Sequence, residues 1–139
     1  MNKLHLGIYG LIVKNNKILL VKKSRGPYIG KLDLPGGSAE HGESVDQALS
    51  REIIEETGIK INKYNLFDNY TAVVDFTDDR GEISMYHVGL IYLIKSFDDS
   101  KLVKENDFED TLGADWYEIS KLTKDQLSPF AFNAITALQ

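Results

Sequence analysis

Runs of apolar, β-favouring residues alternate with short polar segments along this chain, and the pattern predicts strands separated by turns and helices. Strands are predicted at 4–13 and 17–21, joined by a tight turn at Asn15-Asn16, because asparagine tolerates positive φ. A loop rich in glycine and proline follows the second strand. Further segments are predicted as strands at 32–34, within 61–76, at 83–94 and at 116–119, with a hairpin turn at 78–81 and an irregular stretch at 97–113.

Two helices interrupt the predicted strands. The central helix runs from about Val45 to Thr57. Ser44 is a suitable N-cap, and Gln47 three residues later completes a capping box. Gly58 occupies the position where helices commonly end in a left-handed residue. The second helix opens at Pro129, so the mixture of helices and strands favours a sheet packed between helices.

The inward stripe of the central helix begins apolar and turns acidic. At 100° per residue, Glu52, Glu55 and Glu56 fall within one arc of roughly 100°. Like charges at i, i+4, anions near a helix C-terminus and carboxylates turned toward an interior all destabilise a fold. A hard divalent cation bound by carboxylate oxygens would offset all three costs. The alternative is a solvated acidic helix end.

Glycines surround the start of this helix. Pro35-Gly36-Gly37 precedes it, and Gly42 lies in the loop between. Glycine allows backbone conformations and close approaches that a side chain would forbid. Such a loop can aim a carbonyl or an N–H at a metal or a phosphate, although Pro-Gly-Gly taken alone indicates only a turn.

Taken together, these residues resemble the signature of the Nudix hydrolases, G-x5-E-x7-R-E-U-x-E-E-x-G-U, in which U is a bulky aliphatic residue. The chain meets the pattern at every fixed position: Gly37, Glu43, Arg51, Glu52, Ile53, Glu55, Glu56, Gly58 and Ile59. The resemblance implies a Nudix-type α/β/α sandwich, with a mixed β-sheet between helices. It also implies cleavage of a diphosphate linked to some group X, with Mg²⁺ or Mn²⁺ as cofactor.

The resemblance also assigns a metal site. Glu52, Glu55 and Glu56 are expected to bind the metal ions, joined by the backbone carbonyl of Gly36 or Gly37. Bound ions would neutralise phosphate oxygens and lower the pKa of a water molecule.

One carboxylate must then take the proton from that water, and Glu52 is our candidate for this base. In other members of the family the base lies in a distant loop. Arg51 belongs to the same catalytic centre, where we expect it to pair with Glu43 and hold the loop against the helix.

Two charged groups outside the signature are weaker candidates. An acidic loop holds Glu105, Asp107, Glu109 and Asp110, from which Glu109 or Asp110 is predicted to supply an extra carboxylate. The alternative is a solvated loop. Basic residues precede the signature, and Arg25 and Lys31 are predicted to reach a phosphate, as are Lys22 and Lys23. As an isolated set, they are more often surface residues.

Histidines and aromatic residues in the strands have two interpretations. His5 and His87 are predicted to pack in the interior and not to bind a ligand. Three aromatic residues could stack on a base, although aromatic residues in strands usually belong to the core: Tyr70, Phe76 and Tyr86.

Length and composition are compatible with a small enzyme. The chain has 139 residues, and we expect a single domain spanning residues 1–139. The net charge of −5 argues against a general nucleic-acid binder. The absence of cysteine excludes thiol chemistry, and the lack of a long apolar run disfavours a membrane partner. A cytoplasmic location is expected, and a homodimer is left open.

The substrate is not identified by the sequence. Residues 74–77 lack the tyrosine and the proline that are typical of dinucleoside polyphosphate and ADP-ribose hydrolases of the family. Similarity to MutT-like members favours a nucleoside triphosphate or a related nucleotide, while nucleotide sugars and dinucleotides stay open. The alternative function is a nucleotide-sensing module without catalysis, but such modules commonly have eroded signatures, whereas this one is whole.

Overall fold

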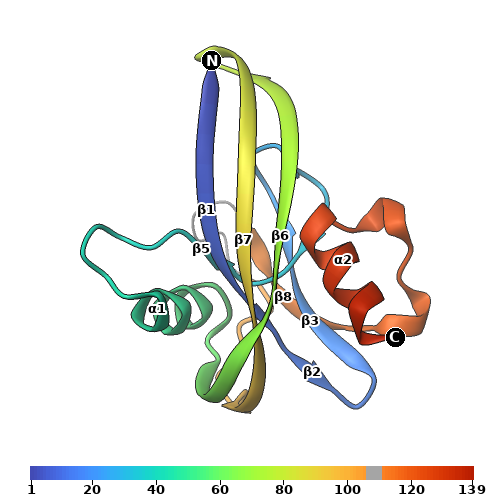
Figure 1. Cartoon of the computed structure of the whole chain (residues 1–139). Helices are drawn as coiled ribbons and strands as arrows, with labels where there is room; N and C mark the ends of the chain where they lie inside the picture. Colours follow the sequence, from blue (N-terminus) through green and yellow to red (C-terminus); the bar gives the residue numbers. More distant parts are fainter. Residues whose placement is uncertain (106–110) are drawn as a thin grey trace.

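The computed structural model describes residues 1–105 and 111–139 (Figure 1). The acidic-loop residues Asp107, Glu109 and Asp110 therefore lie outside the described residues. Two helices, α1 (Val45–Thr57) and α2 (Pro129–Leu138), lie on opposite sides of the strands (Figure 1). The predicted bounds of α1 are confirmed, and α2 begins at Pro129 as predicted.

The first sheet is mixed. It contains β5 (Gly36–Gly37), β1 (Asn2–Leu11), β7 (Gly81–Asp98) and β6 (Lys60–Asp78), in that spatial order. β1 and β7 run parallel, whereas the other neighbouring pairs are antiparallel. The far ends of β1, β7 and β6 rise beyond both helices, with the N-terminus at the tip (Figure 1).

The second sheet is antiparallel and is organised around β3 (Lys17–Lys23). β2 (Val13–Lys14) and β4 (Leu32–Asp33) pair with opposite ends of β3, and β8 (Thr111–Glu118) pairs along its length. Two short 3₁₀ turns, Ile119–Lys121 and Lys124–Gln126, lead from β8 toward α2. The predicted α/β/α class is confirmed, with the strands divided between two sheets, of which the first is mixed.

The core lies on both faces of the strands, because β1 and β3 are covered on both sides. Toward α1, Ile8 packs with Leu49 and Ile53 in one apolar cluster. Toward α2, Tyr9 packs with Phe130 in a second cluster. Strands buried on both faces give continuous apolar runs instead of alternating ones, which explains the uninterrupted apolar stretches of these segments.

Predicted and observed strand boundaries differ most where the chain is polar. β6 and β7 form a long antiparallel hairpin, and β7 continues to Asp98 although an irregular segment was expected from residue 97. β8 already begins at Thr111, whereas the prediction starts at residue 116. The two-residue β5 has no periodicity that a sequence could display. The predicted turns are confirmed, and Asn15 and Asn16 have φ values of 52° and 62°.

Neither helix in the described part of the chain is long and apolar enough to cross a membrane. The cytoplasmic location expected from the sequence stays a prediction.

Two neighbouring glycines leave a gap in the side-chain layer of the first sheet, on the face that packs against α2. We call this gap the notch. Gly7 of β1 and Gly89 of β7 are partners in the parallel register. A Cβ on Gly7 would lie 2.2 Å from the hydroxyl oxygen of Tyr9, and a Cβ on Gly89 would lie 2.5 Å from Cε2 of Phe130. Both rings therefore lie against the backbone of these glycines, a close approach that a side chain there would prevent.

Replacing Gly89 with alanine should lower the free energy of unfolding by about 1–3 kcal/mol, because the new methyl group overpacks the site that Phe130 fills. Phe130→Leu makes room for this methyl group. The double variant should therefore lose less stability than the two single variants lose together, as measured by urea unfolding. Parent-like stability of Gly89→Ala would contradict the notch.

Candidate active site

The ends of α1 are fixed by local interactions, and these position its acidic face. The hydroxyl of Ser44 accepts from the N–H of Gln47, whose side chain accepts from the N–H of Ser44, so the predicted capping box is confirmed. Gly58 has a φ of 78°, and its N–H donates to the carbonyl of Ile54. A Cβ on Gly58 would lie 2.1 Å from the carbonyl oxygen of Lys101, so the helix end also meets the following loop closely.

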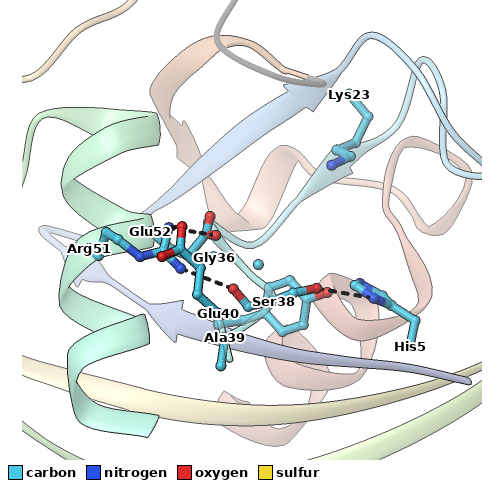
Figure 2. Close-up of a pocket in the computed structure, with 10 residues that line it drawn as sticks. His5, Lys23, Gly36, Ser38, Ala39, Glu40, Arg51 and Glu52 are labelled. Atoms are coloured by element: carbon cyan, nitrogen blue, oxygen red, sulfur yellow. Dashed lines mark hydrogen bonds and ion pairs between the residues drawn. The ribbon is translucent and has the colours of Figure 1, made fainter. Parts of the chain in front are cut away.

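A pocket of about 370 Å³ lies between α1, the loop after β5 and the first strands. We call this space the catalytic pocket. Figure 2 shows Arg51 and Glu52 at one end of it and His5 at the other, with Lys23 across from them. Ser38 joins the two ends, since its hydroxyl lies 3.3 Å from Nδ1 of His5 while its carbonyl accepts from Nη2 of Arg51. The pocket therefore has an acidic end on α1 and a basic wall on β3.

Arg51 ties the loop to the helix. Its Nε donates to Glu43 at 2.7 Å and its Nη2 to the other oxygen of Glu43 at 2.9 Å, a bidentate pair. Its Nη1 lies 3.2 Å from Glu52 and 3.1 Å from Glu55. The predicted contact between Arg51 and Glu43 is confirmed, and the same guanidinium also contacts two of the three clustered carboxylates.

This ion pair fixes the charge of both partners. The hydrogen bonds from Arg51 lower the pKa of Glu43 to about 2, and the bonds to Glu43 raise the pKa of Arg51 above its ordinary value. Both groups therefore stay charged throughout the pH range in which proteins are usually active.

The glycines of β5 bring the loop backbone against the carboxylates. Gly36 has a φ of 146°, and a Cβ there would lie 2.1 Å from the carbonyl oxygen of Ile8. Its N–H donates to the buried carboxylate of Glu56 at 2.7 Å. A Cβ on Gly37 would lie 2.6 Å from Oε2 of Glu52. Only glycine can occupy these two positions while the carboxylates keep their places.

Glu52, Glu55 and Glu56 are the residues expected to hold a divalent cation. Carboxylate oxygens are the donors that such an ion prefers. The space between Gly37 and the carboxylate of Glu52 stays open because Gly37 has no side chain. Among residues 1–105 and 111–139, no three metal-type side chains converge as they stand. Arg51 binds both Glu52 and Glu55 in this arrangement. The three carboxylates would fit an ion only if Glu52 and Glu55 exchanged Arg51 for it.

A second cavity of about 250 Å³ adjoins the catalytic pocket, and His5, Tyr9 and Lys23 line both. We call this cavity the recess. Phe76 and Tyr28 contribute aromatic walls, and the recess is otherwise lined by loop 25–27 and by basic and apolar side chains that include Lys3, Arg80 and Met85. The recess is therefore suited to a flat, partly apolar group attached to an anion.

The buried polar groups at the recess are held by hydrogen bonds. Asp33 also lines it, and its Oδ1 accepts from the hydroxyl of Ser128 at 2.6 Å and from the N–H of Leu34 at 2.8 Å. Ser128 also caps α2 by accepting from the N–H of Ala131. The carboxylate is thus fixed between β4 and α2.

His87 is the central polar group behind the recess. It is 2% exposed, and its two ring nitrogens contact the hydroxyls of Tyr9 at 2.7 Å and Tyr28 at 2.8 Å. Its ring also lies 4.8 Å from His5 and 4.3 Å from Phe130, centroid to centroid. Burial, helped by nearby His5 and Lys23, lowers the pKa of His87 to about 3. The interior packing predicted for His87 is confirmed, and His87 is also hydrogen-bonded at both nitrogens.

The structure separates the two basic candidates. Arg25 lines the recess. Lys31 lines neither cavity, and its ammonium group donates to the backbone carbonyl of Asp125. Lys23, which belonged to the broader basic set, reaches both cavities. The signal for Lys23 is its place on β3, opposite the acidic end of α1, which no spacing along the chain could display.

The remaining candidates also divide. Of the three aromatic residues, Phe76 lines the recess, Tyr70 packs against Phe130, and Tyr86 is half-exposed. Glu105 is exposed, and it lines neither cavity. The extra carboxylate predicted at 109 or 110 lies outside the described residues.

The glycine cradle, the acidic face of α1 and the flanking sheets together define a Nudix site. A family model of the NUDIX domain matches residues 2–138, and the chain belongs to this family. The family uses divalent metal ions. A MutT Nudix hydrolase from Burkholderia pseudomallei has a similar structure, with a TM-score of 0.77, 28% identity and coverage of 99% of both chains.

Curated relatives of this chain are named for several different activities. An ADP-ribose pyrophosphatase of Methanocaldococcus jannaschii is 35% identical over 69% of this chain and 57% of its own length. An 8-oxo-dGTP diphosphatase of Escherichia coli is 35% identical over 49% of this chain and 54% of its own. A nucleoside triphosphatase NudI of an Enterobacter species is 30% identical over 91% of this chain and 88% of its own. The first two matches thus span little more than half of those relatives.

The low pKa of His87 predicts a pH dependence of stability. Because its ordinary value is 6.5 and its folded value about 3, the unfolded chain binds more protons here between these limits. The folded state therefore loses stability as the pH falls from 6.5 toward 3. Glutamine at position 87 keeps a donor and an acceptor but does not titrate.

Between about pH 7 and 5, the parent should lose roughly 1–2 kcal/mol more unfolding free energy than His87→Gln, as measured by urea unfolding at each pH. His41→Gln, which removes an exposed histidine, is the control and should follow the parent. Equal pH slopes for the parent and His87→Gln would contradict a neutral buried histidine.

Proposed function

We propose that this protein is a metal-dependent pyrophosphohydrolase that cleaves a nucleoside diphosphate linked to another group. A nucleoside triphosphate or a related nucleotide is the substrate we favour. The observation that carries this proposal is the catalytic pocket itself, where Arg51 orders Glu52 and Glu55 at one end and Lys23 lies across from them. The relatives named above support the reaction class, because each is a hydrolase of a nucleotide or a nucleotide derivative by name.

The three clustered glutamates would bind the metal ion, and one of them would also take a proton. Glu52, Glu55 and Glu56 would hold the cation, for which we propose Mg²⁺ or Mn²⁺. When bound, this ion supplies charge for the phosphate oxygens and acidifies a water molecule. Glu52 accepts the proton of the attacking water, since it is buried and lies against the backbone of Gly37.

The basic side chains bind and orient the substrate. Lys23 lines both cavities, so its ammonium group is placed to attract the diphosphate between them. Arg25 in the neighbouring loop is placed to contact a phosphate from the recess side. Arg51 keeps Glu43 and the loop in position and thereby maintains the shape of the pocket.

The recess receives the remainder of the substrate. Its aromatic walls, Tyr28 and Phe76, favour a planar group, and its volume of about 250 Å³ is below the range of about 300–1,000 Å³ that is typical of ligand pockets, which favours a small group. This assignment favours a mononucleotide over a dinucleotide. The absence at residues 74–77 of the two substrate markers agrees with it.

A nucleotide panel tests the function. With Mg²⁺ or Mn²⁺, at least one nucleoside diphosphate derivative should be hydrolysed, and EDTA should abolish the reaction. Phosphate or pyrophosphate release measures it. Full activity in EDTA would refute the mechanism, and metal-dependent nucleotide binding without hydrolysis would identify a sensing module instead.

Glu52→Gln separates a base from a metal ligand. If Glu52 takes the proton, kcat should fall by roughly 10²-fold or more, while KM changes little. Glu118→Gln, which alters a surface pair with Lys121 at 3.4 Å, is the control and should keep the parent rate. Restoration of the Glu52→Gln rate to near the parent value by excess Mn²⁺ would show that Glu52 acts chiefly as a ligand.

A further inference from the structure

His87 lines the recess and has a tyrosine hydroxyl at each ring nitrogen. Tyr9 contacts Nε2 at 2.7 Å, and Tyr28 contacts Nδ1 at 2.8 Å. Tyr9 lines both the catalytic pocket and the recess, whereas Tyr28 lines the recess. The three residues therefore form a continuous hydrogen-bonded path from one cavity to the other.

Besides the two tyrosines, the rings of His5 and Phe130 flank His87, with centroids at 4.8 Å and 4.3 Å. Phe130 covers one part of the imidazole ring and has no polar atom to offer. The notch at Gly7 and Gly89 gives Tyr9 and Phe130 the room to lie against the sheet. His87 is 2% exposed, so bulk water does not compete for its nitrogens.

A neutral imidazole carries one N–H and one bare nitrogen. His87 must therefore donate to one tyrosine and accept from the other. A tyrosine that donates to His87 has committed its only hydrogen and can offer a ligand lone pairs alone. The tyrosine that accepts from His87 keeps its hydrogen for another partner.

We propose that His87 allows only one of Tyr9 and Tyr28 at a time to donate its hydroxyl hydrogen to a ligand. The substrate group that contacts Tyr9 in the catalytic pocket therefore determines which groups Tyr28 can bind in the recess. The effect on the substrate rests on the proposed function, because a diphosphate oxygen accepts hydrogen bonds and favours a donating Tyr9. His87 then donates from Nε2 to Tyr9, and Nδ1 becomes bare. Tyr28 donates to Nδ1, and its oxygen faces the recess as an acceptor.

This arrangement predicts the chemistry of the group in the recess. Tyr28 and the neighbouring carboxylate of Asp33 would then both act as acceptors. The recess should favour a substrate whose group X presents an N–H or an O–H there and disfavour one that presents only carbonyl or ring-nitrogen lone pairs. Tyr28 and His87 are thus specificity-determining residues, with His87 acting through the two tyrosines.

The ¹⁵N spectrum of the imidazole distinguishes the two tautomers and tests the exclusion without any substrate. In Tyr28→Phe, Nδ1 faces a phenyl ring, and a bare nitrogen is tolerated there better than a buried N–H without an acceptor. His87 should therefore carry its hydrogen on Nε2. In Tyr9→Phe the same argument places the hydrogen on Nδ1.

Tyr70→Phe is the matched control, because Tyr70 contacts Phe130 of the same cluster and makes no hydrogen bond or ring contact with His87 in the described part of the chain. Its imidazole spectrum should match that of the parent. Opposite tautomers in Tyr28→Phe and Tyr9→Phe support the proposal. The same tautomer in both variants, or a doubly protonated His87 near neutral pH, overturns it.

Kinetics test the coupling with the nucleotide that the parent hydrolyses fastest. Tyr9→Phe and Tyr28→Phe should each lower kcat/KM. The fold-loss in the double variant should be smaller than the product of the two single fold-losses by roughly 2- to 150-fold. Multiplicative losses would overturn the coupling. The tautomer spectra do not depend on turnover. If no nucleotide of the panel is hydrolysed, the proposed function is refuted, but the spectra still test the behaviour of His87.

Discussion

The guanidinium of Arg51 is the contact on which the site depends. It binds Glu43 and the carbonyl of Ser38 on the loop side, and Glu52 and Glu55 on the helix side. The Arg51 side chain is 23% exposed, so these charge-assisted bonds are only partly weakened by water. Without Arg51, the carboxylates of Glu43, Glu52 and Glu55 would lose the cation that they share, and their mutual repulsion would increase.

The same contact explains how the acidic end of α1 is stable before a metal binds. Anions in the last turn oppose the helix dipole and repel each other. Arg51 offsets this repulsion for Glu52 and Glu55, and the N–H of Gly36 binds Glu56. A cation that replaces Arg51 at Glu52 and Glu55 would leave the bidentate pair with Glu43 intact. The loop can therefore stay in place while the metal site forms.

Local signals made α1 and its contacts predictable. The capping box at Ser44, the left-handed Gly58 and the spacing of the glutamates all act within a few turns of one helix. A sequence displays such signals directly, because residues three or four apart are neighbours on the face of a helix. The pairing of Arg51 with Glu43 joins the helix to the loop before it, and the Nudix signature indicated this pairing.

Long-range geometry set the limit of sequence-based prediction. The recess unites β1, the loop that holds Tyr28, β4 and the distal part of the β6–β7 hairpin, and none of these segments carries a pattern that points to the others. His87 illustrates the problem. In the sequence it is a histidine in an apolar strand, and only the fold brings Tyr9 and Tyr28 to its two nitrogens.

The difference between local and long-range contacts explains why the Nudix signature does not identify the substrate. Gly37, Arg51 and Glu52 of the signature line the catalytic pocket, where a diphosphate would lie, and every diphosphate has the same oxygens there. Discrimination between substrates must come from groups that contact the rest of the molecule, since identical contacts cannot distinguish two ligands. The proposal above assigns this discrimination to the recess, where Asp33 is fixed by Ser128 and Tyr28 is bound to His87. A buried polar group whose hydrogen is already committed rejects the wrong partner by leaving it unsatisfied, which is a larger penalty than the gain from one correct hydrogen bond.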